Sequence, residues 1–191
     1  MNALLLHIET LGPWHMGSGE PGERDLDAVV ALDADQLPWV PGKTLKGLLR
    51  EAAQLAEDFE QLTKGWTTWA FGSRDAEVGA LDFRAARLPA EFITWWQQHP
   101  QRESLRTAFF QDYSSTALNE HGIAKDKTLR RVEAVIPVTL HACVSLRPGA
   151  AEREDWAETL TGLLPLVRRL GSHRTRGWGR CCITSSTETQ P

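Results

Sequence analysis

Residues 37–56, LPWVPGKTLKGLLREAAQLA, join a short extended segment to the clearest amphipathic helix of the chain. Pro41 and Gly42 end the extended part, and the hydroxyl of Thr44 can cap the helix that follows. One face of this helix is apolar because small and aliphatic residues recur at helical spacing, namely Leu45, Leu48, Leu49, Ala52, Ala53 and Ala56. The stretch therefore predicts a helix with one buried face.

Strand and helix patterns alternate on both sides of this segment. Apolar patterning indicates strands at residues 3–11, 26–33, 79–87 and around 181–183, and one long strand or a bent pair at 129–146. Helical spacing predicts a short helix over 91–98 and a second amphipathic helix over 151–170, which Pro165 should kink. Long loops are expected at 12–25 and 114–127. The order βαββαβ predicts an α+β fold with a ferredoxin-like (RRM-like) core and a mostly antiparallel sheet.

Length and composition describe an ordinary globular protein. The chain has 191 residues, 41% hydrophobic and 24% charged, and at roughly 150 residues per domain it predicts a single domain, 1–191, with 184–191 as a frayed tail. No apolar run approaches the ~20 residues of a membrane span, and the start does not resemble a signal peptide, so no membrane partner is expected. The three cysteines and the histidines lack metal-binding or disulfide spacing, which favours a cytoplasmic protein without a zinc site.

Charge is unevenly distributed along the chain. Residues 1–40 contain seven acidic residues and one basic residue, a local charge of −6, whereas the net charge is −4. From Leu160 to the end there are five arginines and one acidic residue, a local charge of +4. Separate acidic and basic regions allow one part of the chain to bind an anion while another carries carboxylates.

The glycine-rich segment GSHRTRGWGR, residues 171–180, is the most specific local signal. Glycines let a backbone approach a ligand closely, and three arginines and a histidine surround them, which suits the backbone of a polyanion. The alternative is a solvated turn with scattered arginines. The segment lacks the spacing of a Walker phosphate-binding loop.

Two further basic clusters have both a functional and a plain interpretation. Lys43 and Lys46 lie in the first turn of the helix, where the helix dipole disfavours cations, and a bound phosphate would explain them. Together with Arg50 they can equally be ordinary charges on a helix face. The second cluster, Lys125, Lys127, Arg130 and Arg131, can equally be a charged surface.

Four segments, in order along the chain, resemble motifs of one family. They are WHMGSG at 14–19, PWVPGKTLKGLLR at 38–50, FGS at 71–73 followed by GALDF at 79–83, and the glycine-rich segment. The chain resembles the RAMP superfamily, in particular the backbone subunits of type III CRISPR effector complexes. Ser172 stands where the family usually has a second glycine and Thr175 where it often has serine. Residues 88–128 do not align, and 118–132 best match the family's thumb-like insertion.

The resemblance implies a subunit that holds guide RNA along its phosphate backbone for pairing with complementary target RNA. It also implies other effector subunits and further copies of the chain as partners. His15 is expected to support its loop rather than act as an acid or base. The residues that it assigns to the RNA-binding surface are His15, Gly17, Ser18, Lys43, Lys46, Arg50, Lys125, Lys127, Arg130, Gly171, His173, Arg174, Arg176 and Gly177.

The resemblance makes Asp27 the single residue on which catalysis would depend. By resemblance it is the catalytic aspartate of a metal-dependent endoribonuclease that cuts target RNA. Its carboxylate would hold Mg²⁺ for that step alone, or would accept the proton of the attacking 2′-hydroxyl. Asp33 would be the acid at the turn before Pro38. The alternative is that Glu23, Asp25 and Asp27 form a solvated acidic loop. Two other functions therefore stay open: a guide-RNA processing endoribonuclease of the same superfamily, and a scaffold subunit without activity.

Overall fold

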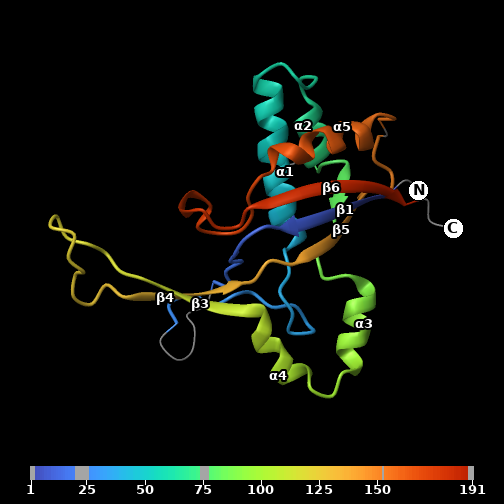
Figure 1. The fold of residues 1–191 in the computed structure, drawn as a ribbon. Coiled ribbons are helices and arrows are strands. Elements are labelled where there is room, and N and C mark those ends of the chain that lie inside the picture. Colours follow the sequence, from blue (N-terminus) through green and yellow to red (C-terminus); the bar gives the residue numbers. More distant parts are fainter. Residues whose placement is uncertain (1–2, 20–25, 74–77, 152, 189–191) are drawn as a thin grey trace.

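A four-stranded sheet forms the centre of the computed structural model, which describes residues 3–19, 26–73, 78–151 and 153–188. Its strands are β1 (Ala3–Thr10), β2 (Leu81–Phe83), β5 (Thr139–Leu146) and β6 (Cys181–Glu188), in the order β2-β5-β1-β6. All three strand pairs are antiparallel (Figure 1). Apart from the inserted β3 and β4, this is the strand order of a ferredoxin-like βαββαβ core, and the predicted α+β fold class is confirmed.

One face of the sheet packs against helices. Leu4, Leu6 and Ile8 alternate along β1 and are buried, because successive strand residues point to opposite faces. The helices α1 (Gly42–Asp58), α2 (Trp66–Phe71) and α5 (Trp156–Leu163) gather above the strands in Figure 1. The buried residues of α1 are Leu45, Leu49, Ala52, Ala53 and Ala56, so the apolar face predicted for this helix is the one that is buried.

The start of α1 corrects the prediction that Thr44 caps it. The helix begins at Gly42, directly after Pro41, whose carbonyl accepts the N–H groups of Thr44 and Leu45. A side chain at position 42 would meet the carbonyl oxygen of Phe83 at 2.1 Å. Pro41 therefore ends the extended segment, and glycine lets the first turn lie directly against β2.

The C-terminal third differs from the prediction at two places. Instead of one kinked helix over 151–170, α5 ends at Leu163 and continues as the 3₁₀ turn η2 (Leu164–Leu166), because Pro165 cannot donate a backbone hydrogen bond. The last strand, predicted around 181–183, extends to Glu188 along the whole of β1. Residues 184–188 are therefore not frayed, and residues 189–191 lie outside the described part of the chain.

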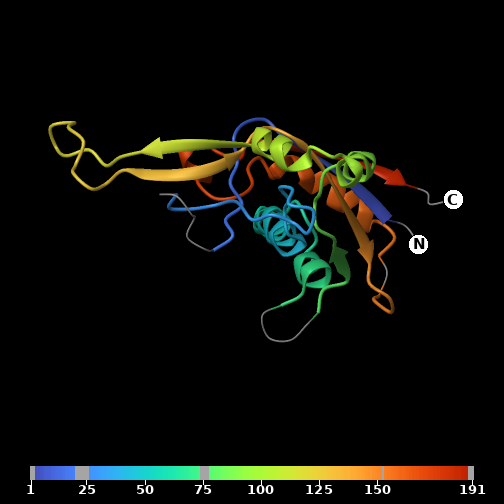
Figure 2. The same ribbon diagram turned by 90° about the horizontal axis from the view of Figure 1, so that it is seen from below.

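A long insertion separates β2 from β5. It contains α3 (Ala90–Gln98), which confirms the predicted helix, then α4 (Arg102–Arg106), the 3₁₀ turn η1 (Thr107–Phe109), and the hairpin of β3 (Phe110–Ser115) and β4 (Arg130–Val135). The bent pair predicted over 129–146 is therefore β4 and β5, which belong to different sheets. Figures 1 and 2 show the hairpin projecting away from the core.

Two predicted strands are shorter or irregular. Residues 26–33 form an extended segment with isolated bridges, among them a parallel one between Ala28 and Val132 of β4. The strand predicted over 79–87 is confined to Leu81–Phe83, with further bridges at Ala86 and Arg87. Among the described residues, no helix combines the length and apolar character that crossing a bilayer requires.

Candidate functional site

The glycine-rich segment is a tightly curled loop held between α5 and β6. Leu170 N donates to the carbonyl oxygen of Gly179 (2.8 Å), which closes the loop at its base. Inside it lies the 3₁₀ turn η3 (Arg174–Arg176), flanked by His173 (φ 57°) and Gly177 (φ 92°), both in the left-handed region. The loop is therefore held in one conformation by its own backbone, as a binding loop requires.

Two of its glycines make close contact with the protein itself. A side chain at Gly171 (φ 77°) would meet the carbonyl oxygen of His15 at 2.4 Å, and one at Gly179 (φ 68°) would meet that of Leu170 at 1.9 Å. Nothing lies within 4 Å of the corresponding position at Gly177. Of these three glycines, only Gly177 therefore leaves open space in which the backbone could approach a ligand.

Gly179→Ala should consequently distort the loop, whereas Gly177→Ala should be tolerated better. Both substitutions place an L-residue in the left-handed region, at a cost of about 1–2 kcal/mol, but only position 179 adds a backbone clash. Thermal unfolding should show the larger loss of Tm for Gly179→Ala. Equal losses for the two variants would mean that the packing against Leu170 does not hold the loop.

His15 joins the first loop to both β4 and the glycine-rich loop. Its Nδ1 donates to the carbonyl oxygen of Glu133 (2.6 Å), and its own carbonyl oxygen accepts the N–H of Ser172 (2.8 Å). The side chain is buried, and the residue is 3% exposed. The imidazole therefore supports the loop, as expected, and is not placed to contact RNA directly. Gly17 and Ser18 beside it are exposed.

Positive charge at the loop comes from its arginines. Burial lowers the pKa of His173, and the neighbouring Arg176 and His15 lower it further, so the ring is neutral at pH 7. Arg174 and Arg176 are exposed. Arg174 lies 3.4 Å from Glu51 of α1, an exposed ion pair of small energetic weight, while Arg176 has no carboxylate within 4.0 Å among the described residues.

The ion pair between Arg174 and Glu51 places the loop beside α1. Lys43, Lys46 and Arg50 follow one stripe of that helix, at spacings of i, i+3 and i+7. In the described part of the chain, none of the three has a carboxylate within 4.0 Å. Arg176 of the loop and the three stripe residues of α1 are therefore cations without an ion pair in the described part of the chain, whereas Arg174 is paired with Glu51 on another side of the helix.

The third basic cluster lies elsewhere. Lys125 and Lys127 are in the connection of the β3–β4 hairpin, and Arg130 begins β4; all three are exposed. The connection projects beyond the core in both views, so the structure does not gather these residues with the glycine-rich loop (Figures 1 and 2). The segment matched to the thumb, 118–132, is this connection together with the first three residues of β4.

Asp27 is exposed and hydrogen-bonded to the start of β4, at the end of the hairpin ladder next to its connection. Its N–H donates to the carbonyl oxygen of Arg131 (2.9 Å), and its Oδ2 accepts the N–H of Arg131 (2.7 Å). Asp33 differs because it is buried: it accepts the N–H groups of Asp35 and Leu37 and pairs with Arg87 at 3.2 Å. It stabilises the turn, as predicted. Glu23 and Asp25, of the alternative acidic loop, lie outside the described residues.

A cavity of about 660 Å³ lies beside Asp27, which does not line it itself; its neighbour Leu26 and its hydrogen-bond partner Arg131 do. Its lining residues are Leu26, Leu32, Arg106, Thr107, Phe110, Asp112, Arg131 and Glu133. The described residues contain no group of three side chains arranged to bind a metal. Mg²⁺ is commonly held by one or two carboxylates plus substrate phosphates and water, so Asp27 fits a site that RNA would complete.

The sequence did not indicate an aromatic contact between the loop and the hairpin. Trp178 packs against His173 (ring centroids 5.2 Å apart) and against Tyr113 of β3 (4.8 Å). Aromatic rings of this kind can stack on bases. Trp178 belongs to the glycine-rich motif that the sequence identified. The strand around Tyr113 was not predicted, because β3 is mostly exposed and lacks apolar alternation.

Comparisons with known proteins agree with this architecture. A family model described as "RAMP superfamily" matches residues 7–182. A chain of the "Cryo-EM structure of the Type III-B Cmr-beta bound to cognate target RNA" is similar in fold, with a TM-score of 0.72 and 12% sequence identity over 96% of each chain. A chain of the apo-state cryo-EM structure of Type III-B Cmr-beta gives a TM-score of 0.66 and 13% identity over 98% of each chain. No curated protein matches the sequence.

Proposed function

The chain belongs to the RAMP superfamily, and from this premise we propose that it is an RNA-binding subunit of a type III CRISPR effector complex. Its partners are then guide RNA, complementary target RNA, other effector subunits and further copies of the chain. One of the similar solved structures is a Type III-B complex bound to cognate target RNA, which supports this role.

The observation that carries the proposal is the backbone-closed glycine-rich loop with its exposed arginines, which contacts the same helix, α1, that carries the basic stripe. Guanidinium groups bind phosphates in a bidentate manner, and phosphate contacts carry no sequence information. Arg174, Arg176 and the stripe residues therefore hold guide RNA by its backbone. Sequence recognition is left to base pairing between guide and target. The lysines of the hairpin connection add phosphate contacts farther along the RNA.

Target cleavage is the second part of the proposal, and Asp27 carries it. The 2′-hydroxyl of the target nucleotide attacks the adjacent phosphorus, the bond from phosphorus to the 5′-oxygen breaks, and the leaving oxygen takes a proton from water. The Asp27 carboxylate, held by the N–H of Arg131 at 2.7 Å, accepts the proton of the 2′-hydroxyl. Bound Mg²⁺ would neutralise charge on the phosphate. Most of the acceleration comes from holding the nucleotide in line for attack.

A cleavage assay separates this function from its two alternatives. The assembled protein should cut target RNA paired with guide and leave precursor RNA intact. Cleavage of precursor would identify a guide-processing endoribonuclease. Cleavage of neither RNA would leave a scaffold subunit.

Assembly along the guide should depend on its length. A subunit that coats a strand makes head-to-tail contacts that do not close, so RNA length sets the number of copies. The exposed Trp95 (48%) of α3 and the aromatic residues around it offer one contact face. Light scattering with guides of increasing length should show stepwise mass increments of one subunit, and a constant monomer on every guide would contradict this.

A further inference from the structure

We propose that Arg102 and Arg106 of α4 bind phosphates of the target strand where it leaves Asp27. This inference rests on the proposed function and adds a site that the sequence did not indicate. It would extend the RNA path onto the insertion between β2 and β5, away from the glycine-rich loop.

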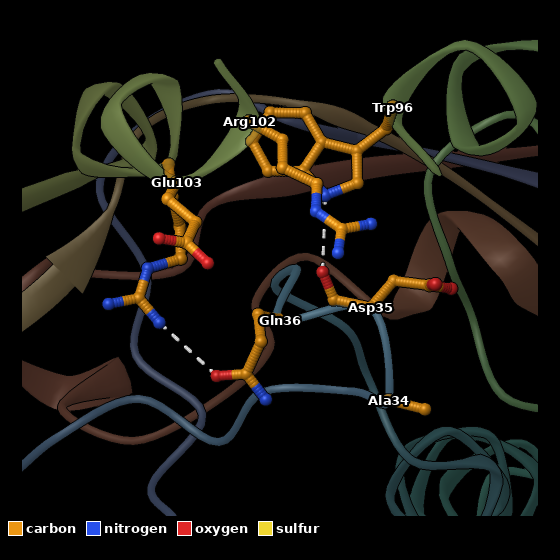
Figure 3. Close-up of a pocket in the computed structure, with 7 residues that line it drawn as sticks. Ala34, Asp35, Gln36, Trp96, Arg102 and Glu103 are labelled. Carbon is orange, nitrogen blue, oxygen red and sulfur yellow. Dashed lines mark hydrogen bonds between the residues drawn. The ribbon is translucent and has the colours of Figure 1, made fainter. Parts of the chain in front are cut away.

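The two arginines line a cavity of about 400 Å³ between α4, the end of α3 and the turn at residues 34–36. Figure 3 shows the side chains of Arg102 and Glu103 facing Asp35 and Gln36 across it. Trp96 is buried and donates its Nε1–H to the carbonyl oxygen of Asp35 (3.1 Å), which fixes the turn to α3. One wall of the cavity is therefore held rigidly, and the opposite wall carries the two cationic side chains.

Both guanidinium groups are available to an anion. Arg106 donates to Oε1 of Gln36 (3.2 Å) and Arg102 to the carbonyl oxygen of Gln97 (3.3 Å), which are neutral acceptors. Neither has a carboxylate within 4.0 Å among the described residues. A guanidinium has five N–H donors, so one such bond leaves others for phosphate oxygens.

The acidic residues of the cavity form no ion pair with these groups in the described part of the chain. Oδ1 of Asp35 accepts the side-chain amide of Gln97 (3.0 Å), and Glu103 is exposed beside the arginines without an ion pair to either. Arg102 and Arg106 are four residues apart on α4, so they lie on one face of the helix and can bind neighbouring phosphates.

Arg106 connects this cavity to the one beside Asp27. It lines both the 400 Å³ cavity and the 660 Å³ cavity beside Asp27. A strand whose scissile phosphate lies at Asp27, and which continues through the cavity beside it, passes Arg106 and then reaches Arg102. The two cavities adjoin at Arg106 and together lead from the β3–β4 hairpin to α4.

The β3–β4 hairpin separates this path from the glycine-rich loop. Asp112 of β3 and Glu133 of β4 are paired and both line the cavity beside Asp27. The next residue of β3, Tyr113, points to the opposite face, where it packs against Trp178 of the loop. The loop and the arginine path therefore serve different strands: guide on one face of the hairpin and target on the other.

The test compares guide binding and target capture for the variant Arg102→Ala/Arg106→Ala. Guide affinity should be unchanged, while a guide-loaded assembly should capture target about tenfold more weakly at 0.15 M salt. The slope of log K against log salt should fall by about 1.4, at ~0.7 per phosphate contact. Arg102→Lys/Arg106→Lys should restore most of the slope because lysine keeps the charge. Lys64→Ala, in the exposed turn between α1 and α2, is the matched control.

Three results would overturn the inference. If the double alanine variant captures target like the wild type while Arg174→Ala/Arg176→Ala loses guide, the proposed function stands and the arginine path does not. If target capture is normal but the mass increments of assembly disappear, the cavity binds an acidic segment of a neighbouring protein instead. If the wild type binds no RNA at low salt, the proposed function fails, and the arginine path fails with it.

Discussion

Asp27→Asn should abolish cleavage of paired target RNA while guide and target binding stay close to wild-type values. The amide keeps the size of the side chain and an oxygen that can accept the N–H of Arg131, so the contact with the start of β4 is preserved. It removes the negative charge that accepts a proton or binds a cation. General bases contribute on the order of 10²–10⁴-fold to rates, and a decrease in that range is expected in single-turnover assays.

Two controls accompany this variant. Asp82→Asn removes an exposed carboxylate from β2, which belongs to the central sheet, and should cleave at the wild-type rate. A target with a single 2′-deoxy nucleotide at the cut position should resist the wild-type protein, because the attacking hydroxyl is gone. If Asp27→Asn cleaves at the wild-type rate, Asp27 is part of a solvated acidic loop and does not carry the cleavage.

Arg174→Ala/Arg176→Ala should weaken binding of guide RNA of any sequence by about the same factor. Each phosphate that an arginine neutralises contributes ~0.7 to the slope of log K against log salt, so the double variant should lower that slope by about 1.4. The difference from wild type is then largest at low salt. Fluorescence anisotropy across a salt series measures both affinity and slope. The loop itself should stay folded, because its shape depends on Gly171, Gly179 and backbone hydrogen bonds.

Glu51→Ala provides the matched control for this variant. It removes the same ion pair, the 3.4 Å contact between Glu51 and Arg174, but leaves the arginine in place without a competing carboxylate. Its RNA affinity should equal or exceed that of the wild type. Unchanged affinity in the double arginine variant, or an effect restricted to one RNA sequence, would mean that the loop is not the phosphate-binding element.

The fold could be predicted where burial imposes a period on the sequence. The apolar spacing of residues 45–56 and the alternation of β1 identify α1 and the first strand correctly, because one face of each must be buried. The hairpin lacks that signal: β3 is almost entirely exposed, and the connection after it is polar. The end of α5 could not be located either, since Pro165 stops the α-helix at a 3₁₀ turn instead of kinking it.

The candidate site was predictable only as separate motifs. Motif positions identified the glycine-rich loop and Asp27 separately. The contacts that tie the loops to the hairpin, from His15 to Glu133 and from Trp178 to Tyr113, link residues distant in sequence. The same holds for α4, because the bond from Arg106 to Gln36 spans 70 residues. Spacing along the chain carries no information about such contacts, which depend on how the insertion packs against the turn at 34–36.

The most direct test of RNA binding through the phosphate backbone is the salt dependence of wild-type binding to two RNAs of equal length and unrelated sequence. Binding through phosphates predicts that log K falls linearly with log salt for both, with the same slope of about −0.7 per contact and nearly equal affinities. A slope near zero, or strong preference for one sequence at every salt concentration, would contradict an RNA-binding surface built on the phosphate backbone.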